Sequence, residues 1–292
     1  MVILKLKNQF PISLLCDIAK IDRSNFYKWK KSYFPNNYAN FDECLKQVFQ
    51  TCDKTYGYRR MHLAMKSLGF KKNEKFVRKR MKKLNLICEI RQKKVKYQHS
   101  DSNIKGNCKN LLNQNFYPDK PNRYYSVDIT YLPSKQGTVY LNVIIDLYGK
   151  IPVAYLSSYS CNSKLAEDTV NLLVQKRKNI KNAIIHSDQG VTYLSKNYIK
   201  KLSELKAIRS NSKKGYPFDN ACSENFFSIF KIEKFYRLGY TPQNKEEIDE
   251  IVEEYIDFYI NQRISLSLGG LTPKKYYDKY IEKKKRLTKK VS

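Results

Sequence analysis

The chain has 292 residues, 41% of them hydrophobic, and carries 56 Lys and Arg against 27 Asp and Glu, a formal net charge of +29. This length and hydrophobic content are those of a folded protein with about two to three domains, which excludes a disordered chain. Its seven cysteines and three histidines show neither Cys-x-x-Cys nor paired-His spacing. A disulfide scaffold and a zinc module are therefore excluded.

A positive charge of this size indicates a polyanionic partner, because Lys and Arg bind phosphates by releasing condensed counterions. Nucleic acid is the leading candidate. A ribosomal or histone-like protein fits the charge equally well, but 24 Tyr and 14 Phe indicate a real core as well as a basic surface. No run of about 18 apolar residues and no signal-peptide pattern occur. We therefore expect no membrane association and a cytoplasmic protein.

Two helical segments are predicted before the main domain. Residues 1–34 read as two short helices with a turn at 21–23, the pattern of a helix-turn-helix or, equally, of a simple helical hairpin. Residues 41–88 form a basic helical module, and residues 51–100 hold 16 Lys and Arg against 3 Asp and Glu. Such a density is commonly a solvated face, but after the turn signal at Leu68-Gly69 it favours a DNA contact. The residues expected to make that contact are Tyr58, Arg59, Arg60, Arg78, Lys79 and Lys82.

Residues 89–121 are a polar, basic linker that is able to follow a DNA backbone. Residues 122–278 then have an α/β pattern. Strands are predicted at 123–131, 138–146, 151–157, 182–187 and 206–210, and helices at 163–178, 194–204, from Glu224 and at 244–261, followed by a last short helix. This order is that of a ribonuclease-H-like core, a mixed five-stranded sheet with flanking helices. Residues 279–292 are expected to be a disordered basic tail.

Three isolated acids occupy particular places in this order. Asp128 lies in the first, central strand, Asp188 ends the neighbouring fourth strand, and Glu224 begins a helix packed across that edge. We therefore expect the three carboxylates to converge. Clustered carboxylates repel one another and need hard cations, for which oxygen atoms are the natural ligands. Two Mg²⁺ ions about 3.5–4 Å apart would serve both hydrolysis and strand transfer at a phosphodiester.

Two further residues share the expected helix face of Glu224. Lys231 lies seven residues later, close to two turns, where its ammonium would hold a DNA phosphate. Asn220, one turn earlier, is expected to position the carboxylate or the substrate.

The ordinary interpretation of any single acid is a surface or capping carboxylate. Asp188 before a Gly fits that interpretation, whereas Asp128 between Val and Ile in a central strand does not, because a buried unpaired acid is destabilising. Asp146 is interpreted as a structural strand-end acid, and His186 as a packed or phosphate-contacting side chain.

Five motifs, taken together and in this order, are specific. They are Ser126-Val-Asp-Ile-Thr-Tyr131, Val143-Ile-Ile-Asp-Leu147, His186-Ser-Asp-Gln-Gly190, Asp219-Asn-Ala-Cys-Ser-Glu-Asn-Phe-Phe227 with Lys231, and Tyr259-x-Asn261-x-Arg263 ending in Leu271-Thr-Pro273. With them the chain resembles the DDE transposases of bacterial insertion sequences, relatives of retroviral integrases. It is most similar to the second-frame product of the group read from two overlapping frames, whose helical module is matched by Tyr56-Gly-Tyr-Arg-Arg60.

The resemblance implies a Mg²⁺-dependent polynucleotidyl transferase, with Mn²⁺ able to substitute, that cuts and joins the ends of its element. Asp128, Asp188 and Glu224 would be its metal-binding triad, and Arg263 would contact DNA. It also implies fusion with a first-frame product and a homo-oligomer on DNA. Two alternatives stay open: a DNA-binding regulator or inactive remnant on the same core, and a nuclease without strand transfer.

Overall fold

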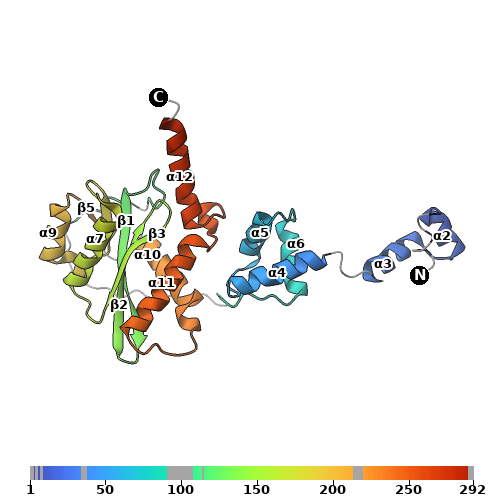
Figure 1. Ribbon diagram of the computed structural model, residues 1–292, viewed down its shortest axis with the longest axis horizontal. Coiled ribbons are helices and arrows are strands. Elements are labelled where there is room, and N and C mark those ends of the chain that lie inside the picture. The colour runs from blue at the N-terminus through green and yellow to red at the C-terminus, as the bar shows by residue number, and fades with distance from the viewer. Residues whose placement is uncertain are drawn as a thin grey trace.

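The structure, a computed structural model, describes residues 9–33, 38–90, 108–113, 115–212 and 220–288, together with residues 3 and 6. Helices α2 (Ile12–Ile18) and α3 (Arg23–Tyr33) form the first helical segment, with the turn between them at the predicted place. In Figure 1 a second group of helices lies between this pair and an α/β domain.

That second group, the three-helix module, consists of α4 (Ala39–Thr51), α5 (Tyr58–Ser67) and α6 (Glu74–Lys83). Its helices share a small apolar core to which Leu45, Met61 and Val77 each contribute a fully buried side chain. The Asn73 side chain caps α6 by accepting the Phe76 N–H at 2.8 Å. Arg80, a member of the basic run, is buried and pairs with Asp42. Part of the predicted basic face therefore stabilises the module itself.

The sheet domain has five strands in the order β3-β2-β1-β4-β5. The first three, β1 (Tyr124–Ser134), β2 (Gly137–Asp146) and β3 (Ile151–Ser158), are antiparallel neighbours. The last two, β4 (Ile184–Ser187) and β5 (Ile208–Asn211), run parallel to β1. This mixed sheet confirms the predicted ribonuclease-H-like fold class.

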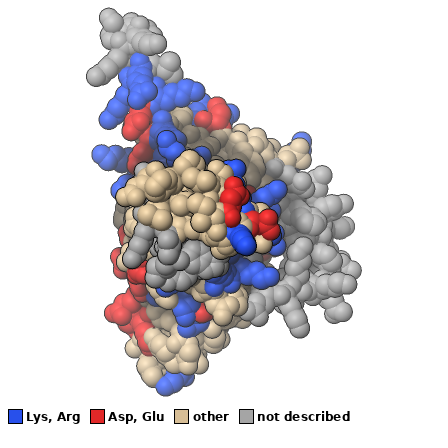
Figure 2. All heavy atoms as spheres, turned by 90° about the vertical axis from the view of Figure 1, so that its right-hand side faces the viewer, with Lys and Arg blue, Asp and Glu red and all other residues tan. Residues whose placement is uncertain are grey.

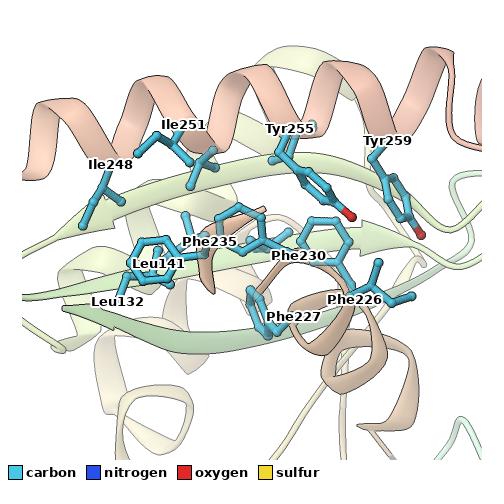
Figure 3. Packing of buried hydrophobic residues seen from close by; sticks show 14 of the residues in the cluster. Leu132, Leu141, Phe226, Phe227, Phe230, Phe235, Ile248, Ile251, Tyr255 and Tyr259 are labelled. Carbon is cyan, nitrogen blue, oxygen red and sulfur yellow. The ribbon is translucent and has the colours of Figure 1, made fainter. Parts of the chain in front are cut away.

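Helices cover the two faces of the sheet. One face packs against α7 (Ser163–Arg177), α8 (Val191–Leu194) and α9 (Lys196–Glu204). The other packs against α10 (Ala221–Glu233) and α11 (Lys245–Asn261). Figure 3 shows Tyr255 and Tyr259 reaching from α11 to Phe226 and Phe230 of α10 above the strands. Fully burying one such ring contributes roughly 1.5–3 kcal/mol, so α10 is held firmly.

The two edges of β1 are paired over very different lengths. Its pairing with β2 runs from Tyr125 through Ser134, whereas its pairing with β4 covers only Tyr124 to Ser126. Beyond Ser126, the β4 side of β1 therefore has no strand partner within the described ranges. Asp128 lies on this open stretch.

Two predictions about the ends of the α/β region need revision. The last helix, α12 (Pro273–Thr288), includes residues 279–288, which were expected to be a disordered tail. Its first turns are anchored because Tyr276 and Tyr280 pack on Tyr148, and its Lys-rich end suits a helix. In the predicted linker, residues 91–107 lie outside the described residues, while Leu112 is buried and Leu111 bonds to Ser210 of β5.

Short 3-10 helices, η2 (Phe235–Arg237) and η3 (Leu266–Leu268), follow α10 and α11. Among the described residues, none of the helices is long and apolar enough to cross a lipid bilayer.

Candidate active site

Asp128 and Asp188 lie where β1 and β4 part. Asp128 is in the middle of β1, and Asp188 directly follows β4. The parallel register pairs Ser126 with His186, so two further residues along each strand bring the two acids to the same level. Residues 60 positions apart in the sequence become neighbours because β1 and β4 are adjacent parallel strands.

The turn after β4 holds Asp188 from two sides. Asp188 Oδ1 accepts the Gly190 N–H at 2.9 Å, and Asn211 of β5 donates to the Asp188 main-chain oxygen at 2.8 Å. A Cβ at position 190 would lie 3.0 Å from Asp188 Oδ1. Glycine at that position therefore allows the carboxylate to lie close against the backbone.

The N-terminal end of α10 is attached to β1, and this attachment places Glu224. Ser126 lies two residues before Asp128 and so on the same face of β1. It donates to Asn220 Oδ1 at 2.7 Å and shares a hydrogen bond with Ser223 Oγ. Glu224 follows in the first turn of α10. Asn220 is buried in this contact, which fits a role in positioning the carboxylate rather than one in touching DNA.

The three carboxylates act on one another electrostatically. Burial, followed by the charge of Asp188, raises the pKa of Asp128 to about 8, and the charge of Glu224 adds to this. Partial burial and then the Asp188 charge also raise the pKa of Glu224. Burial raises the pKa of Asp188, against the opposing Gly190 N–H. The predicted triad is thus a set of acids within electrostatic reach of each other, and the charge of Lys231 offsets only part of the rise in the pKa of Asp128.

The carboxylates do not form a ready-made ion cage. In the described ranges, no three His, Cys, Asp or Glu side chains are gathered closely enough to hold a metal ion. Asp128 Oδ1 accepts the Ile129 N–H at 2.9 Å, and Asp188 Oδ1 is similarly turned to Gly190. The Glu224 side chain is exposed. In both Asp128 and Asp188 the bond to a backbone N–H is made by Oδ1.

Lys231 lies within electrostatic reach of Asp128, on the helix whose first turn carries Glu224. Burial lowers the pKa of Lys231, and the negative charge of Asp128 opposes that change. The Lys231 ammonium stands 4.5 Å from the centre of the Tyr131 ring, and Tyr131 is 66% exposed. Sequence analysis did not single out Tyr131, although an aromatic residue three positions after a candidate metal-binding acid is a usable signal.

Arg60 and Arg263 meet at a different acid, Glu233 in the last turn of α10. Arg263 donates to both Glu233 carboxylate oxygens, at 2.6 and 2.7 Å, and Arg60 donates to one of them at 3.1 Å. Glu233 and Arg263 are both buried. These internal partners correct the expectation that Arg60 and Arg263 bind DNA, and the importance of Glu233 was missed.

The other residues predicted to contact DNA lie on the surface of the three-helix module. Arg59, Arg78, Lys79 and Lys82 are exposed, and Tyr58 is half-buried. Arg59 and Arg78 stand over the Tyr58 ring, 5.7 and 5.3 Å from its centre. Arg59 also pairs with Glu74 at 3.5 Å. The module thus joins α5 and α6 in one exposed basic group, which remains a predicted DNA surface.

Two residues near the carboxylates have structural roles, as interpreted from the sequence. Asp146 is fully buried at the end of β2 and accepts the N–H groups of Asn122 and Tyr148. His186 is fully buried in β4, with Nδ1 2.8 Å from Ser210 Oγ.

Comparison with known proteins gives matches over most of the chain. The family model named Integrase core domain matches residues 118–217, a second model of that name matches residues 224–281, and an HTH-like domain matches residues 36–94. A solved structure of the HTLV-2 integrase catalytic core domain in complex with magnesium is similar at 15% identity and a TM-score of 0.41, covering 54% of this chain and 97% of that one.

Two curated relatives are similar over nearly their full length. The protein named as transposase InsK for insertion sequence element IS150, from Escherichia coli K12, is 31% identical over 276 residues, which cover 94% of this chain and 96% of that protein. Transposase InsF for insertion sequence IS3A, from the same strain, is 29% identical with the same coverage. The chain therefore belongs to the family of insertion-sequence transposases that combine an HTH-like domain with an integrase core.

Proposed function

We propose that this transposase hydrolyses phosphodiester bonds at the ends of its insertion sequence and joins the freed ends to target DNA, with Asp128, Asp188 and Glu224 as the reacting site. The observation that carries the proposal is geometric: Asp128 and Asp188 lie at one level on adjacent parallel strands, and the start of the helix whose first turn carries Glu224 is bonded to the strand of Asp128. Burial first, and the Asp188 charge for Asp128 and Glu224, raise the pKa of the three acids in agreement with this. Structural carboxylates are normally paired with cations or hydrogen-bond donors. Acids left short of positive charge in a family of DNA-acting enzymes are candidates for catalysis.

We propose Mg²⁺ as the cofactor, two ions held by Asp128, Asp188 and Glu224, with Mn²⁺ able to substitute. The residues fit such ions, because carboxylate oxygens are hard ligands and the mutual repulsion of three acids is relieved by divalent charge. When bound, the ions would stabilise charge on the attacking and leaving oxygens of a phosphodiester.

The surrounding side chains prepare the site for a phosphate. Ser126 and Asn220 fix the end of α10, so that Glu224 approaches from one direction. Lys231 places a cation beside Asp128, where it would hold a DNA phosphate, and the Tyr131 ring restricts where that cation goes.

DNA would reach the site across a basic surface. On the face shown in Figure 2, Lys and Arg are spread widely and Asp and Glu occur in smaller groups. We assign the module contact to Tyr58, Arg59, Arg78, Lys79 and Lys82. We further propose that a first-frame product fused to this chain recognises the element ends, and that the fused protein oligomerises on DNA in the bacterial cytoplasm, at the nucleoid.

The test is cleavage and joining of element ends by the fused protein, comparing wild type with Glu224→Gln. The matched control is Glu250→Gln, because Glu250 is an exposed acid on α11. We expect Glu224→Gln to lose both reactions and the control to keep them. Near-normal activity of Glu224→Gln would remove that residue from the site.

The other candidate functions give different results in the same assay. A DNA-binding regulator would bind ends without cutting them. A nuclease without strand transfer would cut ends but fail to join pre-cut ones. Binding of Mn²⁺, followed by electron paramagnetic resonance, tests the ligand set without relying on activity: Glu224→Gln should bind fewer or weaker ions than Glu250→Gln.

A further inference from the structure

The Tyr56–Arg60 motif of the three-helix module makes contact with the Tyr259–Arg263 motif that follows the sheet. Tyr56 OH accepts the Ile264 N–H at 2.7 Å, and the Ile264 side chain packs on the core of the module. Arg60 reaches Glu233, 173 positions later in the chain. Two motifs that looked like separate DNA-binding features therefore form one interface inside the protein.

Glu233 is the centre of that interface. Its contacts show which of its two arginine partners is needed to keep its charged carboxylate buried. Burial alone would oppose ionisation, but the hydrogen bonds and charge of Arg263, followed by the charge of Arg60, lower the pKa of Glu233. Tyr255 OH adds a fourth bond at 3.0 Å. Because Arg263 alone already balances the Glu233 charge, Arg60 is not needed to neutralise the acid. Its contribution is to connect the module to α10.

Further contacts cross the same interface. Arg237, just after α10, bonds to the Asp53 main-chain oxygen at 2.7 Å and to Glu89 at 2.6 Å. A Cβ at Gly270 would lie 2.9 Å from a methyl carbon of Leu63, so α5 packs tightly there. The module is therefore docked at several points, and loss of one should loosen it rather than release it.

The contact at Glu233 ends on the helix that carries Glu224. The two acids are nine residues apart on α10, about 13 Å along a helix axis. The distance between two residues of one helix stays constant, because the backbone hydrogen bonds of the helix fix the rise per residue. DNA held on the exposed face of α5 and α6 is therefore kept at a constant offset from the carboxylates.

We infer that Arg60 is a positioning residue: by binding Glu233 it holds the three-helix module, with its DNA, in register with the carboxylate site at the other end of α10. The inference rests on the proposed function for its effect on cleavage. The docking itself does not.

Arg59 provides the matched control, since it is the adjacent residue with the same side chain. Its side chain is 67% exposed, pairs with Glu74 and stands over the Tyr58 ring of the same module, whereas the Arg60 side chain is 17% exposed and bound to Glu233. The experiment compares Arg60→Gln, Arg60→Lys and Arg59→Gln in the full chain and in its fusion with the first-frame product. It measures hydrogen exchange at the Ile264 amide, affinity for element ends, and the position and rate of cleavage.

We expect Arg60→Gln to speed exchange at Ile264 by about tenfold, the effect of losing one charge-assisted hydrogen bond across the interface. Its affinity for DNA ends should stay within about twofold, while cleavage slows and spreads to neighbouring phosphates. Arg60→Lys should cut at the wild-type phosphate more often than Arg60→Gln does. Arg59→Gln should leave Ile264 exchange unchanged and weaken end binding.

Two results would overturn the inference. The first is Ile264 exchange in Arg60→Gln equal to that of wild type. The second is an affinity loss in Arg60→Gln as large as that in Arg59→Gln with cleavage position unchanged, which would make Arg60 a DNA contact. Failure of wild type to cut DNA would refute the proposed function, and the exchange measurement would still decide the docking.

Discussion

The two ends of α10 carry acids with opposite surroundings. Glu233, in the last turn, is buried between Arg263, Arg60 and Tyr255, and its pKa is lowered. Glu224, in the first turn, lies within electrostatic reach of Asp128 and Asp188, and its pKa is raised. The first acid finds its counter-charge within the fold, and the second does not. The comparison separates an acid that stabilises the protein from one that is available to bind something else.

The largest effect is expected for Glu233→Gln, which leaves Arg263 buried without a negative partner. Breaking a buried ion pair from one side costs roughly 3–5 kcal/mol of unfolding free energy. Urea unfolding should show this loss. Glu250→Gln, on the exposed face of α11, should change stability by less than about 0.5 kcal/mol. Equal stabilities for the two variants would remove the distinction between the ends of α10.

Asp128→Asn should reduce activity strongly without lowering stability, in contrast to the loss of stability expected for Glu233→Gln. Cleavage and joining should fall by at least about a hundredfold, the scale on which one electrostatic group at a reacting centre acts. Stability without divalent ions should be unchanged or higher, because the repulsion with Asp188 and Glu224 is removed. Thermal unfolding beside the cleavage assay checks both. A strongly destabilised Asp128→Asn would show that Asp128 has a structural partner.

The contributions of Glu233 and Asp128 to stability should also change with pH in opposite directions. Glu233 has a lowered folded pKa, so its stabilising contribution is present above the ordinary value of 4.5 and is lost as the pH falls through that lower pKa. Asp128 has a folded pKa of about 8 against an ordinary value of 3.8, so ionising it costs stability as the pH rises between those values.

The difference in unfolding free energy, wild type minus Asp128→Asn, should therefore decline as the pH rises from 3.8 to about 8. The corresponding difference for Glu233→Gln should shrink at the acid end. Millimolar Mg²⁺ should cancel the decline for Asp128, because an ion that binds only the folded state stabilises it. A decline that Mg²⁺ leaves unchanged would contradict ion binding at this acid.

The smallest effect is expected at Lys231, which lies on α10 between Glu224 and Glu233. Tyr131→Ala should weaken DNA binding by roughly twofold to fivefold, because an exposed cation–π contact contributes about 0.5–1 kcal/mol to the placement of Lys231. Tyr131→Phe keeps the ring face and should behave as wild type. DNA affinity measured at several salt concentrations checks this, and an identical loss in both variants would show that the hydroxyl is the important group.

The positions of the three acids in the fold could be predicted from the sequence, because the order of elements determines which strands and helices are neighbours; their role as a site stays a prediction. Asp128 and Asp188 lie at one level through the register of two adjacent parallel strands, and Glu224 lies in the first turn of a helix whose start is bonded to Ser126 of β1. Both steps depend on local patterns, which a single sequence displays.

The interface around Glu233 could not be predicted in the same way. Arg60 and Glu233 are separated by 173 positions, and neither residue differs locally from an exposed surface charge. A basic residue in a basic run looks like a DNA contact until its neighbours in space are known. The same holds for Arg80, whose partner Asp42 lies on another helix. Long-range pairing of charges depends on packing, which composition and periodicity do not reveal.

The unequal edges of β1 have a consequence for self-association. A strand edge with free N–H and C=O groups can accept a strand from another molecule. In the described residues, β1 has no strand partner on its β4 side beyond Ser126, where Asp128 lies and its carboxylate accepts the Ile129 N–H. Charged side chains at an open edge discourage such pairing. The groups proposed to act on DNA thus also help to keep separate copies of the sheet from joining.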